Sequence, residues 1–136
     1  MGDRGNIKIT QYNQFKEQDE TPIYLYTHWT GSRVCQDLAQ AIVKGRTYDS
    51  AYFTRTVFQV MTQRFTSDED LDTGFGIAVG MEQDNEHEIP HVYWKDGKNQ
   101  EMRIDYNGAT YTAEEFVEFF ARARYKNCQG GCCDYE

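Results

Sequence analysis

The fold class follows from the segment Met102-Arg-Ile-Asp-Tyr-Asn-Gly-Ala-Thr-Tyr-Thr-Ala-Glu-Glu-Phe116. At its centre, Asn107-Gly108 is a dipeptide that readily adopts the positive φ angles of a two-residue hairpin turn. Thr112 and Glu115 then stand at the spacing of a capping box, in which two side chains satisfy the first backbone N–H groups of a helix. The segment therefore predicts a β-hairpin that runs directly into a helix, whose apolar stripe is Phe116, Phe119, Phe120 and Ala123.

The remainder of the chain alternates between the periods of strands and of helices. Strands are predicted within 6–12, 22–29, 75–81 and 89–95. One central helix is predicted to run up to Gly45, and another to start at Asp49 as its cap. Because hairpin turns join antiparallel strands, we predict an α+β fold. It would be a mainly antiparallel sheet of about five to six strands, with two central helices and a C-terminal helix packed on it. Residues 1–127 would form a single domain, and 128–136 a Cys-rich flexible tail.

The charge of the chain limits its partners. The 136 residues carry a formal net charge of −8. Because binding to phosphate backbones requires clustered Lys and Arg, this balance argues against nucleic acid as a direct partner. The sequence shows neither the apolar region of a signal peptide at its start nor an apolar run that could span a membrane. We therefore expect a cytoplasmic protein without a membrane partner.

Three familiar motifs lack either the structural context or the residues that their chemistry needs. His87-Glu-Ile-Pro-His91 has the letters of the zinc-protease motif, which needs both histidines on one helix. Pro90 would break that helix at a cost of about 3 kcal/mol, and the following residues predict a strand. The glycines of 74–80 lie within a predicted strand, so they do not form a dinucleotide-binding turn. The acidic stretch 68–79 lacks the glycine and glutamate of a calcium loop. These motifs predict neither a metal nor a cofactor.

The cysteines leave several interpretations open. Cys128, Cys132 and Cys133 could bind zinc or another soft metal, with Cys35 as a fourth ligand. They could also pair as disulfides, react as thiols or belong to an inert tail. No paired C-x-x-C motif and no neighbouring histidine supports a metal, and a chain without a signal peptide does not favour disulfides. An inert tail is the interpretation that we prefer.

The stretch Tyr24-Leu-Tyr-Thr-His-Trp-Thr-Gly31 is the best candidate for a binding site. In a strand, Tyr24, Tyr26 and His28 would share one face, while Trp29 would lie on the other and could equally be a core residue. A helix start, which attracts anions, is predicted directly afterwards. Aromatic rings with arginines suit a nucleotide-like ligand, although the same residue types also dominate protein interfaces. The predicted ligand-binding residues are Tyr24, Tyr26, His28, Trp29, Arg46, Arg55, Asn85 and Glu86.

Four blocks of the sequence support a resemblance. Met1-Gly-Asp-Arg-Gly-Asn-Ile7, Tyr24–Gly31, Thr73-Gly-Phe-Gly-Ile77 and Asp84-Asn-Glu86 resemble a family of short hypothetical proteins of bacteria and their phages. The Cys-rich tail lies outside this likeness. The family has no assigned activity, so the resemblance implies no catalytic residue. It does imply a phage or mobile-element origin, where small acidic proteins often act against bacterial defence.

These observations favour a non-enzymatic binding protein. We expect a phage or mobile-element counter-defence factor that sequesters a nucleotide-derived immune signal, as a homo-oligomer. One alternative is an acidic inhibitor of DNA-mimic or anti-CRISPR type, whose loops at 66–72 and 82–88 would dock on a bacterial defence protein. A hydrolase that uses His28 is a further alternative.

Overall fold

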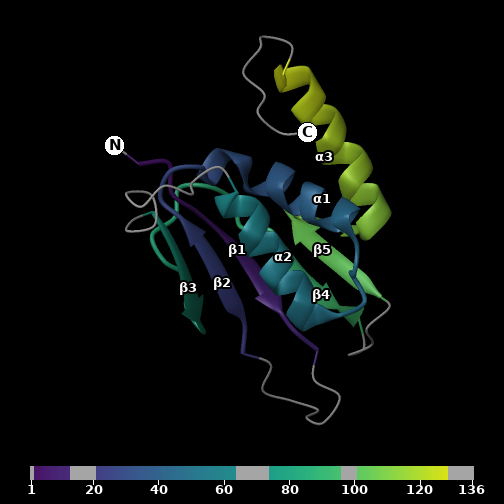
Figure 1. The fold of residues 1–136 in the computed structure, drawn as a ribbon, viewed down its shortest axis with the longest axis horizontal. Helices are drawn as coiled ribbons and strands as arrows, with labels where there is room; N and C mark the ends of the chain where they lie inside the picture. Colours follow the sequence, from purple (N-terminus) through teal and green to yellow (C-terminus); the bar gives the residue numbers. More distant parts are fainter. Residues whose placement is uncertain (1, 13–20, 64–73, 96–100, 129–136) are drawn as a thin grey trace.

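The computed structural model describes residues 2–12, 21–63, 74–95 and 101–128, with the backbone alone for 121–128. Within these residues, one six-stranded mixed sheet is combined with three α-helices and a short 3-10 turn (Figure 1). The predicted α+β class and the predicted order of elements are confirmed. The strands are β1 (Gly5–Thr10), β2 (Ile23–Thr27), β3 (Phe75–Val79), β4 (His91–Trp94), β5 (Met102–Tyr106) and β6 (Ala109–Thr112). The helices are η1 (Gly31–Arg33), α1 (Val34–Lys44), α2 (Ser50–Thr62) and α3 (Ala113–Cys128).

The sheet has the strand order β3-β2-β1-β4-β5-β6. All neighbouring strands are antiparallel except β1 and β4, which run parallel with Lys8 opposite His91. Residues 80–90 connect the edge strand β3 to β4 on the far side of β1, so this connection has to cross the sheet. A hydrogen bond holds this connection beside the residues that precede β1: the backbone N–H of Glu86 donates to the carbonyl of Arg4 at 2.9 Å.

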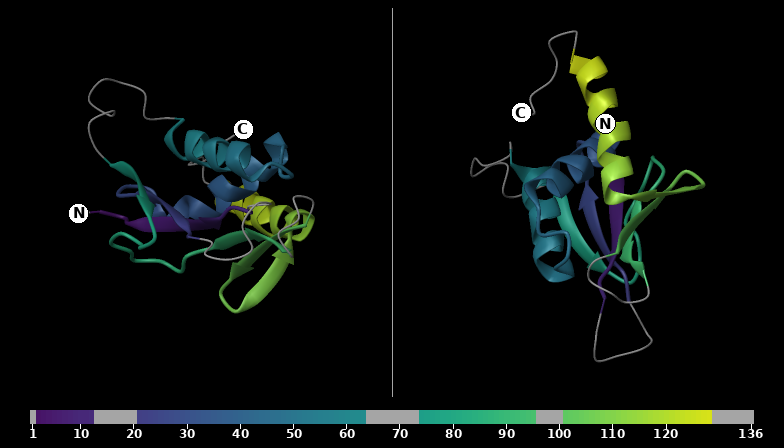
Figure 2. Two further views of the ribbon diagram at one scale, coloured as in Figure 1. Left: turned by 90° about the horizontal axis from the view of Figure 1, so that it is seen from below. Right: turned by 90° about the vertical axis from the view of Figure 1, so that its right-hand side faces the viewer.

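The helices cover one face of the sheet (Figure 2). Side chains alternate along each strand, so Ile7, Leu25 and Ile104 point into the helical layer and are fully buried there. The opposite face carries polar and aromatic side chains, among them Asn6 and Tyr26. Within the described residues, no helix combines the length and the apolar character needed to cross a lipid bilayer.

The local signals of the hairpin and the last helix are confirmed. Asn107 and Gly108 have φ angles of 53° and 84°, as the predicted turn requires. The Glu115 backbone N–H donates to Thr112 Oγ1 at 3.1 Å, and the Thr112 N–H donates to Glu115 Oε1 at 2.9 Å. Asp49 likewise caps α2 by accepting from the N–H of Tyr52.

One cysteine interpretation loses support from the fold. Cys35 is buried on α1, and this burial raises the pKa of its thiol to about 12. Metal ligation uses the thiolate, so Cys35 is a poor fourth ligand for the C-terminal cysteines. Cys128 ends α3, and residues 129–136, which include the rest of the predicted tail, lie outside the described residues.

Candidate functional site

Part of the predicted site comes together at the end of the sheet where β2 finishes. The Tyr26 hydroxyl lies 3.1 Å from Nδ1 of His28, and the His28 and Trp29 rings meet edge to face with their centroids 4.4 Å apart. The connection 80–90 arrives beside them, where the Asn6 amide donates to Asn85 Oδ1 at 3.2 Å. We call this region the sheet-end cluster and add to it the ionisable residues Asp3, Arg4, Glu86 and His87, together with Ser32.

Trp29 is not a core residue. Its side chain is 45% exposed and lies against Gly74, which leads into β3 with a φ angle of +94°. A Cβ atom on Gly74 would stand 2.2 Å from Nε1 of Trp29, so only glycine allows this approach. The indole therefore remains available at the surface.

Tyr24, in contrast, is withdrawn from solvent. It is only 7% exposed and stands opposite Ala78 in the β2–β3 register, while Tyr26 stands opposite Gly76. The small residues that alternate along β3 thus lie beside tyrosines of the neighbouring strand. This arrangement accounts for the small residues Gly76 and Ala78 on one face of β3 without an external ligand. It also leaves Tyr24 too little exposed to stack on a ligand.

The charged part of the sheet-end cluster is anionic in character. Burial raises the pKa of Asp3, but hydrogen bonds from Ser32 and His87 outweigh it and hold that pKa below its ordinary value. The backbone N–H of Arg4 hydrogen-bonds to Glu86 and lowers the pKa of that carboxyl. Both side chains are therefore carboxylates at neutral pH. The cluster suits a cation better than a phosphate.

Asp3, Arg4 and His87 were not among the predicted site residues. Asp3 and His87 meet although 84 positions separate them in the chain. Their contact depends on how residues 80–90 cross the sheet, and periodicity does not predict that path. The nearest signal was the resemblance, whose first block contains Asp3 and Arg4.

The two histidines of the zinc-protease motif, His87 and His91, contact different partners. His87 contacts Asp3 from the connection before β4, whereas His91 lies in β4 with its Nε2 2.8 Å from the Thr10 hydroxyl. Residues 87–91 contain no helical turn. The extended conformation predicted from Pro90 and the residues after it is confirmed, and the pair does not share one metal.

Arg46 and Arg55 do not join the sheet-end cluster. Arg46 follows the C-terminal end of α1, whereas His28 precedes its start, and a helix of 11 residues spans about 16 Å. Instead, both guanidinium groups lie against Tyr52 on α2, at 3.9 and 5.9 Å from the ring centroid. Arg46 is also 3.6 Å from the Asp49 carboxylate.

A groove of about 580 Å³ runs between α2 and the β2–β3 side of the sheet. Its lining is largely apolar and includes Phe58 and the exposed Ile77, and the exposed Arg55 lines it as well. Nη1 of Arg55 donates to Gln59 Oε1 at 2.5 Å, which holds the guanidinium beside the groove. The lining residues are Gln11, Ile23, Leu25, Ala51, Thr54, Arg55, Phe58, Gln59, Thr62 and Ile77.

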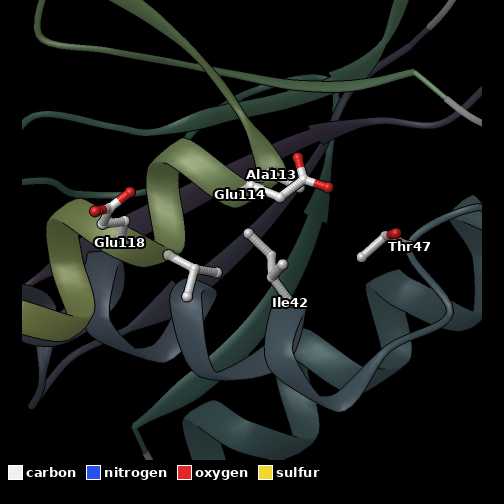
Figure 3. Close-up of a pocket in the computed structure, with 6 residues that line it drawn as sticks. Ile42, Thr47, Ala113, Glu114 and Glu118 are labelled. Atoms are coloured by element: carbon white, nitrogen blue, oxygen red, sulfur yellow. The ribbon is translucent and has the colours of Figure 1, made fainter.

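A second groove, of about 380 Å³, lies between the end of α1 and the start of α3 (Figure 3). Ile42 and Val117 line it together with Glu114 and Glu118. Carboxylates at the rim repel an anion, so this groove suits a nucleotide less well than the groove beside Arg55.

Comparison of the chain with protein-family models, with curated proteins and with solved structures finds no match.

Proposed function

We propose that the protein is a non-enzymatic binding protein that takes a small, flat, anionic ligand of nucleotide type in the groove beside α2. The position of Arg55 carries this proposal, because a cation lines a groove whose surface is largely apolar. Ligand sites of small molecules commonly have this composition, a largely apolar surface with a few polar groups that fix orientation. The volume also falls within the usual range of roughly 300–1,000 Å³.

The contact that we propose for each residue follows from its chemical type. A base or another flat ring would lie against Phe58 and Ile77, and its phosphate would pair with the guanidinium of Arg55. Arg46 reaches the same Tyr52 ring as Arg55, so it would supply a second cation to a ligand that extends along α2. This proposal keeps the predicted roles of the two arginines and replaces the predicted aromatic partners.

The biological role that we propose follows the resemblance stated above. A phage or mobile-element protein with such a groove would sequester a nucleotide-derived immune signal in the cytoplasm of the host. Apolar surface, amides, hydroxyls and a guanidinium line the groove, and these groups hold a ligand without the need for turnover. This composition supports binding rather than catalysis.

Calorimetry against a panel of cyclic and linear nucleotides tests the proposal. We expect one class to bind, and we expect Arg55→Gln to weaken that binding at least about tenfold, since the variant removes a charge-assisted hydrogen bond. Arg103→Gln is the matched control, because Arg103 lies in β5 beside Glu101 and should leave the affinity unchanged. Titrations without heat across the panel, or equal effects of the two variants, would contradict the proposal.

A second candidate function rests on the connection 80–90. Glu82, Asp84 and Glu88 are exposed along it, as an acidic surface that docks on a basic protein requires. The other predicted acidic loop, 66–72, lies outside the described residues. Capture of a host protein that is released by moderate salt would favour this function over ligand binding.

A further inference from the structure

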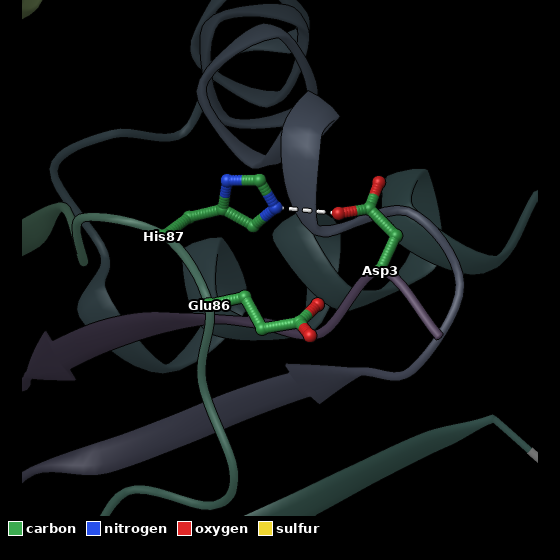
Figure 4. A group of neighbouring side chains, drawn as sticks. All are labelled: Asp3, Glu86 and His87. Atoms are coloured by element: carbon green, nitrogen blue, oxygen red, sulfur yellow. Dashed lines mark hydrogen bonds and ion pairs between the residues drawn. The ribbon is translucent and has the colours of Figure 1, made fainter. Parts of the chain in front are cut away.

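The sheet-end cluster brings three metal-ligating side chains together. One ligand atom each from Asp3, Glu86 and His87 lies within 4.8 Å of the others (Figure 4). Asp3 precedes β1, while Glu86 and His87 belong to the connection before β4. The closest pair is His87 Nε2 and Asp3 Oδ1, at 2.5 Å. The set therefore contains one imidazole nitrogen and two carboxylates.

The supporting contacts orient these ligands from outside. The backbone N–H and the hydroxyl of Ser32 donate to Asp3 Oδ2 at 3.0 and 2.7 Å, so the other oxygen of Asp3 faces His87. The main chain of Asp3 is fixed as well, because its N–H donates to the His28 carbonyl and its own carbonyl accepts from Gly31. Oε1 of Glu86 accepts from the Arg4 N–H at 2.9 Å. Such outer contacts are what hold metal ligands in place.

A cation already lies at this position. Nη2 of Arg4 is 3.0 Å from Glu86 Oε2, the oxygen of Glu86 that the backbone does not hold. The same guanidinium is poorly accommodated, because its buried Nε has no hydrogen-bond partner among the described residues. Exchange of this group for a metal ion would free Arg4 to reach solvent while Glu86 stays in place.

We propose that Asp3, Glu86 and His87 form a binding site for a divalent transition-metal ion of the zinc type. An imidazole with carboxylates suits such ions, whereas calcium and magnesium prefer oxygen ligands alone. At bond lengths of about 2.1 Å, two ligand atoms on one tetrahedral ion stand about 3.4 Å apart. The contact between His87 and Asp3 therefore has to widen by about 1 Å, which a small side-chain rotation achieves. The ion takes the place of the proton between the two groups, and water fills its remaining position.

Titration of the full chain with Zn²⁺ after chelator treatment tests the site. The Cys128→Ser, Cys132→Ser and Cys133→Ser changes are combined first, so that the C-terminal thiols cannot bind the added ion. We expect a single zinc equivalent and a rise in Tm on binding. His87→Ala and Asp3→Asn should each weaken binding at least about tenfold.

His91→Gln is the matched control, since it alters the other histidine of the same five-residue stretch and should leave zinc affinity unchanged. Arg4→Met should tighten binding, because it removes the competing cation from Glu86. Circular dichroism of each variant shows whether it is folded, and His87→Ala serves if Asp3→Asn does not fold. No zinc binding, or an equal loss in His87→Ala and His91→Gln, would overturn the site.

Discussion

Gly74 and Gly108 show how one residue type serves two purposes in this chain. Their φ angles are similar, at +94° and +84°. Around Gly108 there is open space, so its only requirement is the hairpin turn. Gly74 must in addition leave room for the indole of Trp29. Asn107-Gly108 could be recognised from the sequence as a turn, whereas the second role of Gly74 depends on a residue far away in the chain.

Alanine at the two positions should therefore have unequal effects. Gly108→Ala should cost about 1–2 kcal/mol of unfolding free energy, the strain of a left-handed conformation with a Cβ. Gly74→Ala should cost about 1–3 kcal/mol more, because the new methyl group forces Trp29 to move. Urea denaturation of both variants measures the difference, and equal losses would show that Trp29 adapts freely.

His91 should make the stability dependent on pH. Burial lowers the pKa of His91 below its ordinary 6.5, and the nearby charge of Lys8 lowers it further, although Asp105 opposes this. Between the two pKa values the unfolded chain binds more protons than the folded one, so stability falls as the pH drops below 6.5. His91→Gln can keep a hydrogen bond to Thr10 without this titration. The unfolding free energy of the wild type should drop more steeply between pH 7 and 5 than that of the variant.

Parallel pH profiles of the wild type and His91→Gln would contradict this assignment. Asp3 acts at lower pH and in the same direction. Its pKa is held below the ordinary 3.8, so the stability it contributes is lost as the pH falls through that lower value. The two contributions are thus separated by their pH range.

At the scale of elements, the unit formed by β5, β6 and α3 was the most predictable part of the chain. Its turn, its capping box and the start of its helix all follow from neighbouring residues, so local chemistry determines them. The parallel contact of β1 with β4 was not predictable in this way. It depends on the path of residues 80–90 across the sheet. Hydrogen bonds to Arg4 and Asn6 hold this segment in place, and both join segments that are distant in the sequence.

The capping box can be tested within this unit. Thr112→Ala removes the side-chain acceptor of the Glu115 N–H and should lower the unfolding free energy by about 1 kcal/mol. Thr112→Ser keeps the hydroxyl and should lose much less. Thermal unfolding of both variants provides the comparison, and an equal loss in the serine variant would point to the methyl group instead of the cap.

At the scale of the whole molecule, the candidate sites lie where separate parts of the chain meet. Aromatic and charged residues could be selected from the sequence, but their grouping could not. Tyr26, His28, Asn85 and Glu86 gather at one end of the sheet. The guanidinium groups of Arg46 and Arg55 lie against Tyr52 of α2 instead, because α1 carries the chain away from the end of β2. Residue type thus indicated what could bind, and only the topology showed which residues lie together.

The topology also bears on the expectation of a homo-oligomer, through the edge strand β3. Its even-numbered residues pair with β2, as the bonds from His28 N to Gly74 O and from Gly80 N to Pro22 O show, so Ile77 and Val79 direct their backbone groups to the open edge. Their side chains are 61% and 71% exposed. An apolar edge of this kind is prone to pair with another strand.

We therefore expect two copies of the chain to associate through β3, antiparallel and centred on Ile77, which would place Phe75 opposite Val79 of the second copy. Ile77→Lys should weaken this association, since lysine on an edge strand opposes pairing, while the unfolding temperature of the monomer stays within a few degrees. Sedimentation across a range of concentrations measures the association. Met81→Lys, just beyond the end of β3, is the control: a monomer at every concentration, or the same effect from both lysines, would show that the edge of β3 is not the contact.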